Sequence, residues 1–178
     1  MGFVSWLGGG RTVDLKIGDA APGFELSDQN GATHRLECYR GRWLVLYFYP
    51  RDDTPGCTRE ACEFRDDLPA LRDLQATLLG VSTDAPASHR KFAAKYRLSF
   101  PLLSDPHGRV VAAYGSLFTL GPLRFARRHS FIIDPAGKLA EIYRHVDPAT
   151  HSMRVRDDLR ALLGADAGDG GNPLGQER

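Results

Sequence analysis

Two cysteines five positions apart, Cys57 and Cys62, are the residues in this sequence best suited to covalent chemistry. Cys57 follows Thr54-Pro55-Gly56, and a hydroxyl residue before a proline is a strong helix-start signal, with the threonine at the N-cap. Cys57 would then lie in the first helical turn, near unpaired backbone N–H groups and the positive end of the helix dipole. Both favour the thiolate, the form that attacks a peroxide O–O bond and becomes a sulfenic acid.

The helical pattern also predicts that the two cysteines differ in exposure. An apolar stripe starts at Cys57 and continues at helical spacing through Ala61, Phe64, Leu68 and Leu71. The Cys57 side chain should therefore point inward, toward a sheet. Cys62 lies about 140° further around the helix, on a flank beside Arg65 and Asp66. A buried nucleophile and a more exposed partner suit a pair in which one thiol attacks and the other resolves.

Three apolar runs predict buried strands around this helix, at residues 43–49, 78–82 and 130–134. The third run ends in a turn, Asp134-Pro135-Ala136-Gly137, and residues 138–146 then alternate as an antiparallel partner strand. Helices are expected from Pro55, with a kink or restart at Pro69, and over 86–96, 109–114 and 148–163. This order of strands and helices predicts an α/β domain with a central mixed β-sheet flanked by helices.

Length, composition and charge are those of an ordinary globular protein. The 178 residues are 42% hydrophobic with a formal net charge of +1, which is typical of one soluble domain and lacks the basic field of a nucleic-acid binder. We expect a flexible arm at 1–13, a single domain at 14–163 and a disordered, glycine-rich tail at 164–178. No apolar run approaches the roughly 20 residues that cross a membrane, and no signal peptide is evident, so we expect a cytoplasmic location.

The segment from Tyr49 to Cys62 resembles the active site of peroxiredoxins. Their pattern, Pro-x-x-x-Thr/Ser-x-x-Cys, is matched by Pro50, Thr54 and Cys57. A second cysteine five residues later on the same helix resembles the atypical two-cysteine subgroup, the bacterioferritin-comigratory-protein or PrxQ type. The similarity runs over residues 16–163 and includes the segments at 16–24, 47–50, 100–105 and 128–134.

This resemblance implies a thioredoxin-like fold and a role for each matching residue. Thr54 would hydrogen-bond the incoming peroxide, and Pro50 would shield the thiolate from solvent. Arg128 would reach Cys57 from a neighbouring strand and stabilise the thiolate, because a desolvated thiolate is costly without a permanent cation. Arg127 is the alternative, since a shift of one residue in the alignment would exchange the two arginines.

The resemblance also implies a reaction and its partners. Hydroperoxides would oxidise Cys57, an intramolecular disulfide to Cys62 would follow, and thioredoxin or a glutaredoxin would reduce that disulfide. Glu60 stands where the subgroup also has glutamate, and a supporting role is expected. No cofactor is expected, and no metal either, because the two cysteines point different ways and the six histidines are scattered.

Other interpretations stay open. Cys57 or Cys62 could be ordinary helix residues, Arg128 a surface arginine, and Cys38, which has no partner motif, a structural or incidental thiol. A dithiol–disulfide oxidoreductase is a rival function, although that activity normally uses Cys-x-x-Cys. A redox-sensing or binding module of the thioredoxin fold is another.

Residues 115–127 are unusually apolar and show no strong strand or helix pattern. Either they cover the active-site pocket or they form an apolar contact patch. The apolar residues in question are Leu117, Phe118, Leu120, Leu123 and Phe125. We expect a monomer, with a weak dimer as the alternative.

Overall fold

Strand β3 (Trp43–Phe48) lies at the centre of the fold, and all six of its side chains are buried. In the computed structural model, which describes residues 13–168, it lies between parallel strand β4 (Ala76–Ser82) and antiparallel strand β8 (Ser130–Ile133). An uninterrupted apolar run is what a strand covered on both faces requires. The three strands predicted from apolar runs are confirmed as the middle of the sheet.

The complete sheet has seven strands in the order β2-β1-β5-β4-β3-β8-β9. Parallel pairing joins β3 to β4 and β4 to β5, whereas every other pairing is antiparallel, so the predicted mixed sheet is confirmed. Strand β9 (Leu139–Tyr143) pairs antiparallel with β8, so the partner strand predicted over 138–146 is confirmed. Three short strands that the sequence pattern did not indicate complete the other side: β1 (Glu25–Asp28), β2 (Thr33–Arg35) and β5 (Leu102–Ser104).

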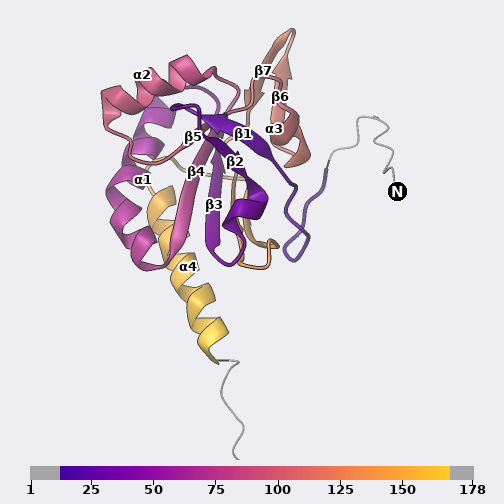
Figure 1. Cartoon of the computed structure of the whole chain (residues 1–178), viewed down its shortest axis with the longest axis vertical. Helices are drawn as coiled ribbons and strands as arrows, with labels where there is room; N and C mark the ends of the chain where they lie inside the picture. The colour runs from indigo at the N-terminus through magenta and orange to yellow at the C-terminus, as the bar shows by residue number, and fades with distance from the viewer. Residues whose placement is uncertain (1–12, 169–178) are drawn as a thin grey trace, which may run out of the picture.

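Helices cover both faces of the sheet (Figure 1). Side chains of β3 alternate between two cores, one shared with α1, α2 and α4, the other with α3 and the short 3-10 helix η1. The bounds are α1 (Pro55–Asp73), α2 (Pro86–Tyr96), α3 (Arg109–Ala113), α4 (His151–Gly168) and η1 (Leu36–Tyr39). Within residues 13–168, none of these helices is both long and apolar enough to cross a membrane.

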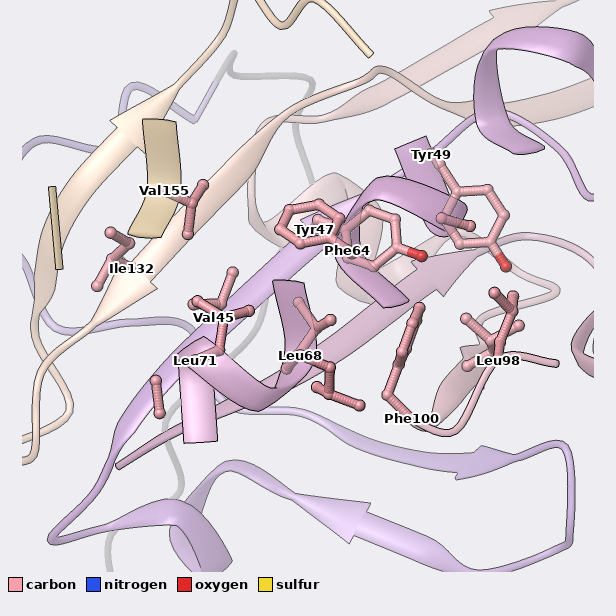
Figure 2. Packing of buried hydrophobic residues seen from close by; sticks show 14 of the residues in the cluster. Val45, Tyr47, Tyr49, Phe64, Leu68, Leu71, Leu98, Phe100, Ile132 and Val155 are labelled. Atoms are coloured by element: carbon pink, nitrogen blue, oxygen red, sulfur yellow. The ribbon is translucent and has the colours of Figure 1, made fainter. Parts of the chain in front are cut away.

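Aromatic packing fixes α1 against the end of β3 (Figure 2). The Tyr47 ring on β3 lies 4.8 Å from the Phe64 ring on α1, centroid to centroid, and both side chains are fully buried. Burying one such ring contributes roughly 1.5–3 kcal/mol. The first turn of α1 is thereby held at the carboxyl end of β3, where open α/β sheets place their functional groups.

Two expectations for the helices are wrong in detail. Helix α1 is one continuous helix through Pro69, so the expected restart is wrong, while the alternative of a kink stays a prediction; the proline is exposed, on the side away from the core. Helix α4 begins at His151, after a turn at 148–150, and continues through Gly164 to Gly168. A glycine inside a helix costs only about 1 kcal/mol, and Ala165 and Ala167 favour the helix on its other side. The rest of the expected arm and tail, residues 1–12 and 169–178, lies outside the described residues.

The apolar segment 115–127, which shows no strong strand or helix pattern in the sequence, contains a β-hairpin. Its strands are β6 (Leu117–Leu120) and β7 (Leu123–Ala126), paired with each other in a sheet of their own. Gly121 takes φ +58° and Pro122 follows it in the two-residue turn. Glycine at positive φ followed by proline at its fixed negative φ makes a type II′ turn, which suits a tight hairpin. The hairpin stands out from the body of the molecule (Figure 1).

Candidate active site

Cys57 occupies the first turn of α1, as its sequence context predicts. Thr54 is the N-cap residue with extended backbone angles, and Pro55 is the first helical residue. Helix geometry leaves the N–H groups of this turn without intrahelical partners, next to the sulfur. The Cys57 side chain is 1% exposed, so a thiolate there has almost no solvent to stabilise it.

Arg128 supplies the positive charge that such a thiolate needs. Its Nη2 donates to Cys57 Sγ at 3.3 Å, and its Nη1 donates to Glu60 Oε2. Arg128 lies just before β8, and the adjacent backbone is fixed because Phe48 N donates to the His129 carbonyl at 2.8 Å. Arg127 is exposed and lies over the Phe118 ring at 5.4 Å. The structure therefore brings Arg128, rather than Arg127, to the sulfur.

Glu60 shares the guanidinium with Cys57. Its side chain is fully buried, and Oε1 has no hydrogen-bond partner among the described residues. Burial raises the pKa of Glu60 to about 7 against the opposing effect of Arg128. Burial by itself would lower the pKa of Arg128, but the charges of Glu60 and Cys57 raise it overall, so the guanidinium stays charged. Cys57 and Glu60 thus share one cation, and burial brings the pKa of Glu60 close to neutral pH.

The loop before α1 is anchored by a buried polar cluster centred on Asp52. The Asp52 carboxylate accepts hydrogen bonds from Tyr49 Oη at 2.8 Å and from Ser88 Oγ at 2.7 Å. Asp52 Oδ2 also lies 2.8 Å from His89 Nδ1, while His89 Nε2 lies 3.2 Å from the Leu103 carbonyl oxygen. His89 thus links the Asp52 carboxylate to the backbone of β5, and this buried polar cluster ties the loop to α2.

The next residue, Asp53, attaches the same loop to α2 a second time. It adopts φ +57°, a left-handed conformation that costs energy for any residue except glycine. Its carboxylate accepts from Lys95 Nζ at 2.8 Å and from Tyr96 Oη at 2.6 Å, both at the end of α2. The geometry of Thr54, directly after it, thus depends on α2.

The remaining predicted site residues lie around this centre without direct contact to the sulfur in the hydrogen-bond network. The Thr54 hydroxyl donates to the Arg51 carbonyl at 3.1 Å rather than capping the helix, which leaves its oxygen lone pairs available. Pro50 is half-buried at the end of β3, at the start of the same loop. Cys62 is half-buried on α1, and Cys38 is exposed; all three cysteines are free thiols.

Sequence patterns did not indicate three participants. Asp52 and His89 are 37 positions apart, and nothing local to either residue points to the other. Tyr47 is a core strand residue by pattern, yet its buried hydroxyl has no partner in the described chain, and burial together with the Glu60 charge raises its pKa. Residues 13–168 contain no cluster of three or more His, Cys, Asp or Glu side chains that could hold a metal ion.

A thioredoxin-like domain with a buried cysteine at a helix start, paired with an arginine, is typical of thiol-based redox proteins. Comparison with known proteins agrees: the model of the AhpC/TSA family matches residues 17–142. The chain is 39% identical to peroxiredoxin Bcp of Bacillus subtilis, over 84% of this chain and 98% of that protein. It is 41% identical to the chloroplastic peroxiredoxin Q of Populus jackii, over 85% of this chain and 72% of that protein.

Solved structures show the same relationship. The crystal structure of peroxidoxin BcpB from Mycobacterium tuberculosis has a TM-score of 0.78 and 36% identity, over 83% of this chain and 98% of that chain. A mutant of PrxQ from Xylella fastidiosa has a TM-score of 0.79 and 34% identity, over 84% and 98%. The chain belongs to the AhpC/TSA family of peroxiredoxins, among relatives of the PrxQ or Bcp type. The predicted family and thioredoxin-like fold are confirmed.

Proposed function

We propose that this protein is a thiol-dependent peroxidase that reduces hydrogen peroxide and organic hydroperoxides through Cys57. The observation that carries the proposal is the 3.3 Å contact between Arg128 Nη2 and the buried Cys57 sulfur at a helix start. The Cys57 thiolate attacks the terminal peroxide oxygen and the O–O bond breaks. The alcohol or water leaves with a proton, and Cys57 becomes a sulfenic acid.

Arg128 and the loop residues assist this step in different ways. Arg128 stabilises the thiolate and the negative charge that develops on the leaving oxygen, the kind of preorganised electrostatic effect that dominates many enzymes. Thr54 hydrogen-bonds the peroxide, and Pro50 limits access of water to the sulfur. Glu60 keeps the Arg128 guanidinium directed at Cys57 by holding its second nitrogen.

Cys62 resolves the sulfenic acid. Its thiol attacks the Cys57 sulfur, water leaves, and an intramolecular disulfide forms. On an ideal helix, two Cα atoms five residues apart are about 8.6 Å from each other. A disulfide usually requires roughly 4.4–6.8 Å, so the first turns of α1 must unwind before the bond can close. Amide hydrogen exchange tests this step: residues 57–64 should exchange faster in the oxidised protein, while β3 stays protected.

A dithiol protein, thioredoxin or a glutaredoxin, would complete the cycle by reducing the Cys57–Cys62 disulfide and becoming oxidised itself. A cytoplasmic location and a monomeric state, with a weak dimer as the alternative, belong to the same proposal. A reducing compartment suits three free thiols and a disulfide that must be re-reduced in each cycle. The rival dithiol–disulfide oxidoreductase has no separate support, because four residues separate the two cysteines.

The experiment that tests the function follows peroxide consumption in single and multiple turnovers. Cys57→Ser should abolish it. Cys62→Ser should retain one turnover and then accumulate oxidised Cys57, because the resolving thiol is absent. Cys38→Ser is the matched control and should behave as wild type. Equal loss of the first turnover in the Cys57 and Cys62 variants would overturn the assigned roles.

A further inference from the structure

The β6–β7 hairpin has one face made only of large apolar side chains. The register pairs Phe118 with Phe125 and Leu120 with Leu123. Side chains alternate along a strand and cross-strand partners share a face, so these four residues lie together on one side of the hairpin. We call this side the apolar hairpin face.

This face points to solvent. Phe118 is 42% exposed, Leu120 63% and Leu123 55%, three of the six exposed large hydrophobic side chains in the described chain. The opposite face holds the hairpin to the body: the Arg124 guanidinium donates to the His107 carbonyl at 2.7 Å, and Thr83 Oγ1 donates to the Arg124 carbonyl at 2.8 Å. The hairpin thus presents its apolar side outward, the reverse of the arrangement that burial favours.

An exposed arginine, Arg127, lies beside the apolar hairpin face. Residues 115–129 contain three arginines and no acidic residue. Arg124 and Arg127 are exposed, and neither forms an ion pair with any of the residues 13–168. Arg127 lies over the Phe118 ring at 5.4 Å, next to an open groove of about 950 Å³ whose wall also includes Arg144 and Asp147. An exposed apolar face with an unpaired arginine at its edge is complementary to a surface with anionic groups above an apolar layer.

We propose that the apolar hairpin face docks on an anionic lipid bilayer, with Leu120 and Leu123 entering the headgroup region and Arg127 binding lipid phosphates. A second copy of this chain is a poorer occupant. Two copies joined through this face would bring their unpaired arginines together, and one hairpin face is small beside the 1,200–2,000 Å² of a typical stable interface. The binding itself is independent of the proposed peroxidase activity.

The test is sedimentation of the reduced, full-length protein with vesicles of phosphatidylcholine alone or mixed with phosphatidylglycerol. Wild type should bind the anionic vesicles and not the neutral ones. The double variant Leu120→Ser/Leu123→Ser should lose at least about tenfold in affinity per leucine. Ile17→Ser/Met153→Ser is the matched control, because both residues are exposed and apolar but lie elsewhere, at 60% and 47% exposure.

The charge contribution is tested separately with Arg127→Glu. Removing one arginine near an anionic surface should weaken binding about fivefold, and reversing its charge should weaken it further. Lys91→Glu, on the exposed side of α2, is the control and should bind as wild type. Peroxide reduction in solution, without vesicles, should be unchanged in the leucine variant.

Three results would overturn the docking proposal. One is equal binding to neutral and anionic vesicles, or none to either. Another is an equal loss of binding in the Leu120/Leu123 variant and in its control. The third is a stable wild-type dimer by light scattering that the leucine variant converts to monomer, since this would assign the apolar hairpin face to a second copy.

Discussion

Variants of the Arg128–Glu60 pair can separate the contribution of Arg128 to stability from its contribution to the reaction with peroxide. Arg128→Met removes the cation from both Cys57 and the fully buried Glu60. Arg128→Met/Glu60→Gln removes the cation together with the buried carboxylate, and Glu60→Gln completes the double-mutant cycle. We expect the single arginine variant to lose stability and activity, and the double variant to regain stability alone.

The size of the stability loss follows from the burial of Glu60. Leaving one member of a buried ion pair without its partner costs about 3–5 kcal/mol. Glu60 can avoid part of this cost by binding a proton, because burial already raises its pKa to about 7. A carboxyl whose folded pKa is raised contributes stability below its unfolded pKa and loses it as pH rises through the folded pKa. The penalty of Arg128→Met should therefore be small at pH 6 and larger at pH 8.

Urea unfolding at both pH values measures the stability of all four proteins, and stopped-flow fluorescence measures the first reaction with peroxide. The double variant should unfold within about 1 kcal/mol of wild type and show no pH-dependent penalty, because replacing both partners of a buried pair is often neutral. Its peroxide step should stay about 10²–10³-fold slow, as in Arg128→Met. Recovery of the peroxide rate in the double variant would refute the reasoning, since Arg128 would then serve only to neutralise Glu60.

Three further predictions concern the groups around the site. Tyr47→Phe should leave the free energy of unfolding unchanged or raise it by about 1 kcal/mol, because the lost hydroxyl has no hydrogen-bond partner in the described chain. A decrease in the free energy of unfolding of more than about 1 kcal/mol, measured by urea unfolding, would contradict this. Asp52→Asn should lower the free energy of unfolding by about 1–3 kcal/mol and slow the first turnover, since it removes the buried carboxylate that Tyr49, Ser88 and His89 contact. Asp53→Asn, at an exposed ion pair, should cost at most about 1 kcal/mol. Burial lowers the pKa of His151 to about 4, so the contribution of the neutral imidazole to stability is lost as pH falls from about 6.5 through 4. His151→Asn should therefore flatten the decline in Tm between pH 7 and pH 4.5. An equally steep decline in the variant would show that other groups cause the loss of stability in acid.

The parts of the fold that could be predicted are those with strong local signals. Thr54-Pro55 marks the start of α1 because capping and the fixed φ of proline act within one turn. The apolar run of β3 marks a buried strand because no other strand environment tolerates it. The position of Cys57 in the first turn follows from these two local signals alone.

Contacts between distant segments could not be predicted in the same way. Glu60 and Arg128 are 68 positions apart, and only the pairing of β3 with β8 brings them together. The β6–β7 hairpin was not predicted for a different reason. Sequence patterns identify strands by apolar residues that face the core, whereas the apolar residues of this hairpin face solvent. Gly121-Pro122, a type II′ turn signal between two short apolar runs, was the local feature that could have revealed it.

The measurement that tests the central claim most directly is a peptide mass map of the reduced protein after one equivalent of peroxide. We predict a disulfide joining the peptides that carry Cys57 and Cys62, with Cys38 remaining a free thiol. Sulfenic acid on Cys57 should be trapped only when Cys62 is replaced by serine. A disulfide that includes Cys38, or a Cys57 left unoxidised while peroxide is consumed, would contradict the proposed mechanism.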